Sequence, residues 1–410
     1  MNQRLFLLIA ALCISLNGSA QSGGSPYSSF GIGDNIYQGW GQRQGLAGAG
    51  IALRSDFFMN NKNPATYAAL RSPFTTVFDL GINFSYEQFS TSDTKVNQRD
   101  GNLSHAAIWL KPAPAYGMGL GLEPVTDVQY SILNQRDWSE IVGNYQVVNE
   151  GEGGLSRLYW GHSLSLGKQL SIGLQANAYF GSIVKSEEAR SSQQNDFFEV
   201  ESTTNFNGFG LEWGLQWQQQ LGADLLTIGA VFKSESSLNA SQELSLSNGT
   251  DTLFGETNDL STDYFIPRTY GFGISLKRPN ILLTTELQYE GWGNQEQEGE
   301  ASWNDVWSFT VGSEFRLTAN SFKDYSQSLV LRTGFSVRNS QLSINDSSFN
   351  QYTASFGLGI PYRSGLNHIN IGYSYNHRGR KDDGLVLERQ HQIGVSFSLR
   401  DRWFVKRKYD

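Results

Sequence analysis

Apolar residues recur at every second position along most of this chain, from Phe74 to Leu399. Polar residues or glycines stand between them, and helical spacing is rare. The clearest runs are Phe78-Leu80-Ile82-Phe84-Tyr86, Phe209-Leu211-Trp213-Leu215-Trp217 and Ile393-Val395-Phe397-Leu399. Strict alternation is typical of β-strands with one apolar face and one polar face. The sequence therefore predicts an all-β protein.

Strand length separates the two architectures that fit this pattern. In a soluble sandwich the apolar faces meet in a core, whereas in an outer-membrane barrel they face lipid. Most of the predicted strands exceed the usual length of about five or six residues and reach the roughly nine to eleven that cross a bilayer at a tilt. We therefore expect a transmembrane antiparallel β-barrel of 14 strands over residues 73–400. The strands are predicted near 74–89, 102–111, 115–131, 153–167, 169–186, 198–219, 224–238, 263–277, 280–292, 304–317, 327–339, 351–362, 366–378 and 388–400.

The connections between the predicted strands alternate in length. Short turns are predicted at 112–114, 168, 220–223, 278–279 and 361–365, and longer polar links at 90–101, 132–152, 187–197, 239–262, 293–303, 340–350 and 379–387. Short periplasmic turns and longer outer loops are typical of such barrels. Residues 141–148 fit either a hairpin within an outer loop or an extension of a strand. We assign them to the loop, because a fifteenth span would break the parity of the barrel.

The N-terminus has the features of an export signal. Arg4 precedes an apolar run, Leu5 to Leu16, and the small residues Gly18 and Ala20 follow it. The run is too short for a transmembrane anchor. Residues 1–20 are therefore predicted to be a signal peptide, and the barrel is predicted to lie in the outer membrane of a Gram-negative bacterium, in contact with its lipid.

Composition argues against several classes of function. The net charge of −8 disfavours a nucleic-acid binder, which needs a basic surface. The single cysteine, Cys13, lies in the signal peptide, and the histidines at 105, 162, 368, 377 and 391 lack metal-ligand spacing. We expect these histidines to be solvated or interfacial. We predict no enzyme activity, no metal site and no cofactor.

Residues 21–72 do not alternate, are rich in glycine, and precede the first strand. A segment of this kind cannot form membrane spans, so we expect it to fold into the lumen as an N-terminal hatch. Its stretches SPYSSFGIGD (25–34), GLAGAGIAL (45–53) and NNKNPATYAAL (60–70) resemble the hatch of FadL-type outer-membrane transporters. Asn63, Pro64 and Ala65 match the hatch motif of that family. The ending LRDRWFVKRKYD (399–410) is similar to the branch of the family found in Bacteroidota.

The resemblance implies passive uptake of hydrophobic small molecules such as long-chain fatty acids. In that family the ligand leaves through a gap in the wall beside the third strand, which corresponds here to 115–131. Pro124 in that strand removes a backbone donor and could open such a gap. The alternative is an ordinary bend at that proline. Some relatives resemble subunits of outer-membrane machines, so the alternative function is a non-conducting interaction barrel in a secretion or protein-assembly complex, with protein partners. Residues 401–410 are predicted to form a basic periplasmic tail.

Overall fold

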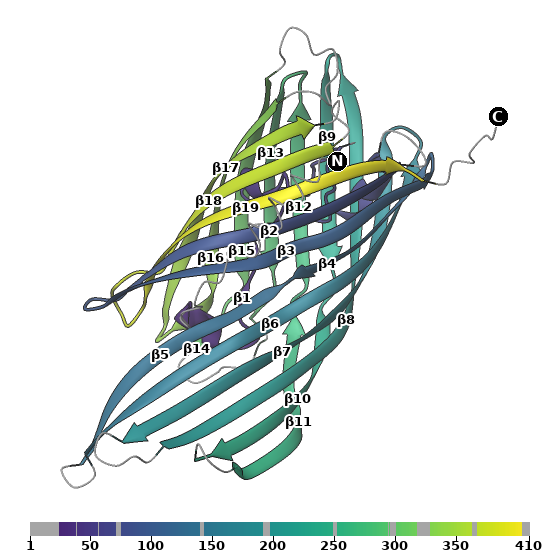
Figure 1. Cartoon of the computed structure of the whole chain (residues 1–410). Coiled ribbons are helices and arrows are strands. Elements are labelled where there is room, and N and C mark those ends of the chain that lie inside the picture. The colour runs from purple at the N-terminus through teal and green to yellow at the C-terminus, as the bar shows by residue number, and fades with distance from the viewer. Residues whose placement is uncertain are drawn as a thin grey trace, which may run out of the picture.

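The computed structural model describes residues 24–37, 39–55, 57–70, 75–139, 143–191, 197–248, 252–293, 295, 301–317, 329–362 and 367–403. The predicted signal peptide and most of the predicted basic tail lie outside the described residues. Within these ranges, the chain forms one closed antiparallel β-barrel of fourteen wall strands (Figure 1). No helix in the described part of the chain is long and apolar enough to cross a membrane.

Ten of the wall strands are continuous in the described residues, and four are interrupted by short breaks. The continuous strands are β2 (Thr75–Ser90), β3 (Lys95–Ala113), β6 (Gly143–Leu166), β7 (Leu170–Ser191), β8 (Phe197–Leu221), β13 (Ile281–Glu290), β16 (Leu329–Ile344), β17 (Ser347–Tyr362), β18 (Asn367–Arg378) and β19 (Leu387–Arg402). The interrupted strands are β4 (Tyr116–Pro124) with β5 (Thr126–Ser139), β9 (Asp224–Lys233) with β10 (Ser236–Ser247), β11 (Thr252–Ile266) with β12 (Thr269–Lys277), and β14 (Ala301–Trp303) with β15 (Val306–Leu317).

The barrel closes where its last strand pairs with its first. The ladder between β19 and β2 runs from Leu387↔Ser90 to Arg402↔Thr75 without a register shift. Closure leaves no open sheet edge in the hydrocarbon region, where water cannot satisfy backbone groups. We call the end where β2 begins and β19 ends the near end, and the opposite end the far end.

Alternation assigns the two faces of each strand as the sequence predicts. On β8, Leu215 is 44% exposed on the outside, whereas its neighbour Gln216 points inward and is fully buried. On β13, Leu283 is 51% exposed and Leu282 is buried. The outer face is therefore an apolar belt, and the inner face is polar and packed.

An aromatic row marks the far-end margin of this belt on the outer wall. Trp213, Phe232, Tyr270, Tyr289 and Trp307 follow one another across five strands, with ring centroids 5.0 to 6.3 Å apart. The Tyr289 hydroxyl donates a 2.7 Å hydrogen bond to Asp305, between β14 and β15, and this bond holds the pKa of the Asp305 carboxyl below its usual value. Aromatic residues with a polar tip are typical of the boundary between lipid and water.

Several strands extend much farther than the alternation predicts. Most of the predicted long links at 90–101, 132–152, 187–197, 239–262 and 340–350 belong to strands. Assigning 141–148 to a loop was wrong for its described part, because 143–148 belong to β6. Backbone pairing can continue in water without an apolar face, so polar side chains hid these extensions. Some connections at the far end are consequently short, such as 91–94 and 345–346.

Beyond the breaks, part of the wall separates into a six-stranded extension. It consists of β5, the first half of β6, the far-end halves of β7 and β8, and β10 and β11, which run together toward the lower part of Figure 1. Its two edges are β5 and β11. The ladder between β3 and β4 ends at Ala106↔Leu122, and β5 pairs with β6 instead of β3.

The N-terminal segment, residues 24–70 as described, lies inside this wall. It contains η1 (Pro26–Ser29), β1 (Asp34–Asn35), η2 (Gln44–Leu46) and η3 (Pro64–Ala69), and most of its side chains are buried. At the far end, its Tyr27 and Ile32 join a hydrophobic core with Val128, Phe206 and Trp303. The space between the extension and the rest of the wall is thus packed by the chain's own N-terminal residues.

The face assignment predicts where charge is tolerated. Leu215→Arg and Leu283→Arg should each impair assembly into the membrane, because arginine on the lipid face costs about 2–4 kcal/mol near the midplane. Asn205→Arg is the control: it lies on the same face of β8 as Leu215 but beyond the belt, and is already exposed. Heat-modifiable migration of membrane fractions would measure folding. Equal folding of all three variants would contradict the assignment.

Candidate functional site in the barrel lumen

The Asn63-Pro64-Ala65 triplet anchors the N-terminal segment to the inner wall. Asn63 is fully buried and caps η3, because its side-chain oxygen accepts a 3.0 Å hydrogen bond from the Ala65 amide. Pro64 occupies the first helical position, where its missing N–H costs nothing. The Asn63 amide donates to the carbonyls of Ile51 at 2.8 Å and of Leu215 on β8 at 3.2 Å. One side chain therefore joins the helix, its own segment and the wall.

Inward-facing glycines let the segment approach the strands closely. A Cβ on Gly214 would lie 2.1 Å from the Asn63 side-chain oxygen, and one on Gly173 would lie 2.3 Å from the carbonyl carbon of Pro64. Similar contacts occur between Gly334 and Leu46 and between Gly229 and Ile51. A side chain at these positions would occupy the space that the N-terminal backbone takes.

Glu123, the residue before Pro124, joins the segment to the wall. Its carboxylate accepts hydrogen bonds from Trp40 Nε1 at 2.5 Å and from Asn61 Nδ2 at 2.9 Å. Arg157 on β6 pairs with the same carboxylate at 2.6 Å and lies 3.5 Å from Glu212. The alternation places Glu123 on the inner face but could not predict Trp40, because the two residues are 83 positions apart.

Other buried charges in the lumen are also paired. Glu314 on β15 forms ion pairs with Arg332 on β16, at 2.9 Å, and with Arg316. Lys62 of the N-terminal segment pairs with Glu286 on β13, which also accepts the Gly50 amide at 2.8 Å. Pairing offsets much of the cost of removing these charges from water.

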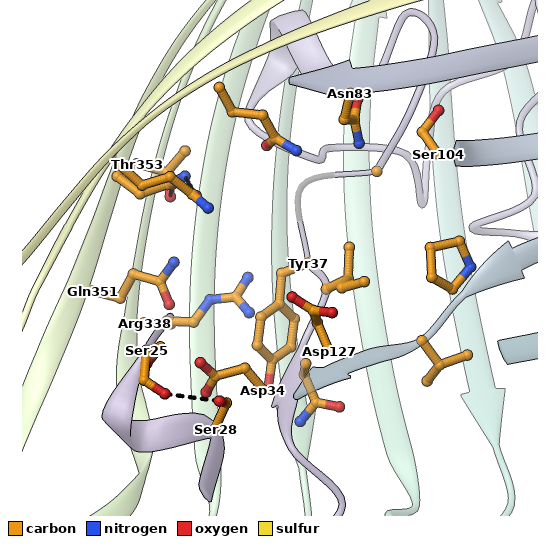
Figure 2. A pocket seen from close by; sticks show the side chains of 18 of the residues that line it. Ser25, Ser28, Asp34, Tyr37, Asn83, Ser104, Asp127, Arg338, Gln351 and Thr353 are labelled. Atoms are coloured by element: carbon orange, nitrogen blue, oxygen red, sulfur yellow. Dashed lines mark hydrogen bonds between the residues drawn. The ribbon is translucent and has the colours of Figure 1, made fainter. Parts of the chain in front are cut away.

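A polar cavity of about 320 Å³ remains above these networks, toward the far end. Figure 2 shows Tyr37 inside it with Arg338 alongside, whose guanidinium carbon lies 3.3 Å from the ring centroid. Burial raises the pKa of the Tyr37 hydroxyl well above its usual value, so the group stays neutral. Asp34 and Glu388 share Arg378 at the margin of the cavity. The lining is charged and hydrogen-bonding, which suits water or a polar group rather than an acyl chain.

His105 and His368 correct one expectation. Both are buried, whereas the sequence suggested solvated or interfacial histidines. His105 Nε2 lies 2.7 Å from Asp79 Oδ1, and the Trp40 ring stacks on the imidazole with centroids 3.8 Å apart. A β-bulge at Ser104 shifts the register here, from Gly81↔His105 to Ile82↔Leu103, and simple alternation cannot detect it. We assign His105 a packing role because the Trp40 ring covers its imidazole.

Pro124 lies in the wall and apart from the Asn63 anchor. It is the last residue of β4, two positions beyond the last residue of that strand paired with β3. At this break the N-terminal segment takes over the pairing: Ile36 donates to the Val125 carbonyl at 2.9 Å, and β1 pairs with Thr126 and Asp127. The role of Pro124 in ligand passage remains a prediction.

Among the residues that the structure describes, no group of three or more His, Cys, Asp or Glu side chains could hold a metal ion. The contacts described above between the N-terminal segment and the wall are hydrogen bonds, ion pairs and close backbone contacts.

Comparison with solved structures shows the same β-barrel fold in three other barrels of known structure. The Pseudomonas putida toluene transporter TodX superposes with a TM-score of 0.63 at 14% identity, over 90% of this chain and 100% of that chain. A Pseudomonas aeruginosa FadL homologue gives 0.60 at 12% identity, over 90% and 99%. The Ralstonia pickettii toluene transporter TbuX gives 0.56 at 14% identity, over 89% and 99%.

Comparison of the sequence with protein-family models assigns the chain to a family. The family model described as BamG matches residues 1–410, and the chain belongs to the BamG family. No curated protein sequence matches it.

Removing the Glu123 carboxylate should destabilise the barrel strongly. Glu123→Ala leaves Arg157 without its closest partner and Trp40 without an acceptor, at a cost of about 3–5 kcal/mol. The free energy of unfolding in urea with detergent would measure this. Asp224→Ala is the matched control, because its partner Arg278 is 62% exposed, and such surface pairs contribute about 0–1 kcal/mol. Equal losses in the free energy of unfolding would show that the Glu123 network contributes no more stability than a surface ion pair.

Filling one glycine should disturb the anchor. Gly214→Ala places a methyl group against Asn63, and overpacking of this kind costs about 1–3 kcal/mol. We expect faster proteolysis of the N-terminal segment while the barrel stays folded. Gly255→Ala should have no such effect, because nothing lies within 4 Å of its Cβ position. Unchanged proteolysis of Gly214→Ala would contradict the anchoring contacts.

Proposed function

We propose that this protein is a non-conducting interaction barrel of the outer membrane, acting as a subunit of a protein-assembly complex. The observation that carries the proposal is the packing of the lumen. Among the described residues, the N-terminal segment occupies it through buried polar contacts, and the cavity of about 320 Å³ beside this segment is polar and charged. A transporter for hydrophobic molecules would need an apolar path at this place.

The family assignment supports the same function. The BamG name refers to the BAM complex, and its model spans the chain. The likeness to TodX and TbuX supports a barrel of the FadL type, and none of the three neighbours is an enzyme by its title. A fold can be reused for another purpose when its interior is filled. The origin in the Bacteroidota branch stays a prediction.

Orientation follows from chain direction and the wall. We propose that the near end, where the first wall strand begins and the last wall strand ends, faces the periplasm. The far end then faces the exterior. The apolar belt then contacts outer-membrane lipid. The N-terminal segment acts as the predicted hatch. Within the lumen it runs from the far end, at Tyr27, toward the near end, where β2 begins.

Gentle detergent extraction followed by identification of co-purifying proteins tests the function directly. A defined set of proteins, present in constant ratio through two purification steps, would support it. Recovery of the barrel alone, from membranes in which other complexes remain intact, would contradict it.

Conductance tests the closed lumen. Deleting residues 24–66 should leave a barrel that conducts small ions in planar bilayers, because the β19–β2 ladder that closes the wall does not include that segment. The intact protein should conduct little. Equal, low conductance of both would show that something other than this segment closes the lumen.

Passive uptake of hydrophobic molecules such as long-chain fatty acids is the second candidate. The separation of β3 from β5 beyond Leu122 favours it, because an opening in the wall beside Pro124 would let a ligand leave toward the lipid. Uptake of a labelled long-chain fatty acid by cells with and without the protein would decide between the two. Uptake that depends on the protein would favour transport.

A further inference from the structure

The six-stranded extension ends in an edge strand of fifteen residues, β11. β11 pairs with β10 from Ser236↔Ile266 to Ser247↔Thr252. On its second edge, no strand pairs with it within the described ranges, since β13 pairs with β12 and β15. The strand has no proline between Thr252 and Ile266 that would block pairing. An edge of this length is a template for an added strand.

The inner face beside this edge, which also carries Phe206 and Ala240, presents apolar side chains. Val200, Leu246 and Phe254 lie in register across β8, β10 and β11, on the same face as the buried Phe206 and Ala240. Phe254 is 49% exposed. A separate apolar row therefore lies on this face, two largely polar rows beyond the hydrophobic core that holds the N-terminal segment, and its Val200 and Phe254 are exposed.

The charge of the last hairpin restricts what can pair there. Residues 236–266 contain Glu243, Glu256 and Asp259 among their acids and no Lys, Arg or His. A second copy of β11 would bring like charges together across the new ladder, which is destabilising. A segment with Lys or Arg between apolar residues would complement both features.

The opposite edge of the same extension already accepts an added strand. There β1 of the N-terminal segment pairs antiparallel with Thr126 and Asp127 of β5. The side-chain hydroxyl of Ser28 adds to the contact, because it donates to the Gln129 carbonyl at 3.2 Å and accepts from the Gln129 amide at 3.1 Å. A two-residue stretch of extended main chain, β1, thus pairs with one edge of this sheet.

We infer that the outer edge of β11 over residues 252–260, with which no strand of the described residues pairs, binds an extended, basic and apolar segment of a partner polypeptide, which adds as a further strand and packs its apolar side chains on Phe254. This inference rests on the proposed function, for which it names a docking surface at the far end. Main-chain hydrogen bonds would supply affinity, and the alternate side chains would supply specificity.

A model peptide tests the surface on the purified full-length protein. The probe has eleven residues, with lysine and valine alternating, and its control has the same length with two valines replaced by proline. Binding of the probe should slow amide exchange in β11 by about tenfold or more, while β13 remains unchanged. The proline control should do neither, because it cannot complete a ladder.

Two variants on one strand distinguish binding to the inner face from non-specific binding of the peptide. Phe254→Asp should weaken binding of the probe by about tenfold through loss of apolar contact. Leu253→Asp should change it by less than about twofold, because Leu253 is equally exposed, at 52%, on the other face. Equal effects, or β11 amides that exchange slowly without any peptide, would overturn the inference. Protection of β11 that grows with protein concentration alone would favour self-association and overturn it too.

Failure here is distinguishable from failure of the proposed function. If the Phe254→Asp protein still co-purifies with every partner and neither form binds the probe, the complex exists and this edge is not its docking surface. If the wild-type protein has no partners but binds the probe as expected, the result supports the binding surface and contradicts the assembly role.

Discussion

Closure of the backbone ladder between β19 and β2 is the constraint on which the rest of the structure depends. In lipid, an unpaired N–H or carbonyl costs several kcal/mol, so the sheet must join its own edges over the full height of the belt. The unbroken register from Ser90 to Thr75 meets that requirement. At Leu122 the ladder between β3 and β4 ends, and beyond it the wall continues as the extension.

The closed wall creates an interior that must also be filled. Fourteen strands enclose more space than their inward side chains occupy, and glycines such as Gly214 and Gly334 leave room for a second layer of backbone. The N-terminal segment takes that room, and Asn63, Glu123 and Glu286 connect it to three parts of the wall. A closed lumen and an extended far end together favour a protein that holds partners over one that passes molecules.

The sequence predicted features that depend on one strand and missed those that depend on two. Alternation located the wall strands because the apolar face of each strand can be recognised within one short stretch of sequence, as in Phe209 to Trp217. The extension was predicted only in part: the strand expected at 198–219 reaches into it, but 132–152 and 239–262 were expected to be links, because polar residues such as Glu243 interrupt the apolar period although their backbones still pair. The contact between Trp40 and Glu123 could not be predicted, since nothing in either local pattern identifies its partner. The bulge at Ser104 changes the parity of β3 and turned a histidine assigned to the surface into a buried one.

A disulfide across the lumen tests most directly whether the segment and the wall form one packed unit. The mature chain is expected to lack cysteine, so an introduced pair would be the only one. The Cβ of Ala52 lies 3.3 Å from the Cβ position of Gly273 on β12, close to the separation of about 3.5–4.5 Å that a disulfide needs. Ala52→Cys with Gly273→Cys should cross-link in native outer membranes, whereas Ala52→Cys with Ile274→Cys, which faces outward, should not. Absence of the first cross-link, or equal yield of both, would contradict a segment packed against the inner wall.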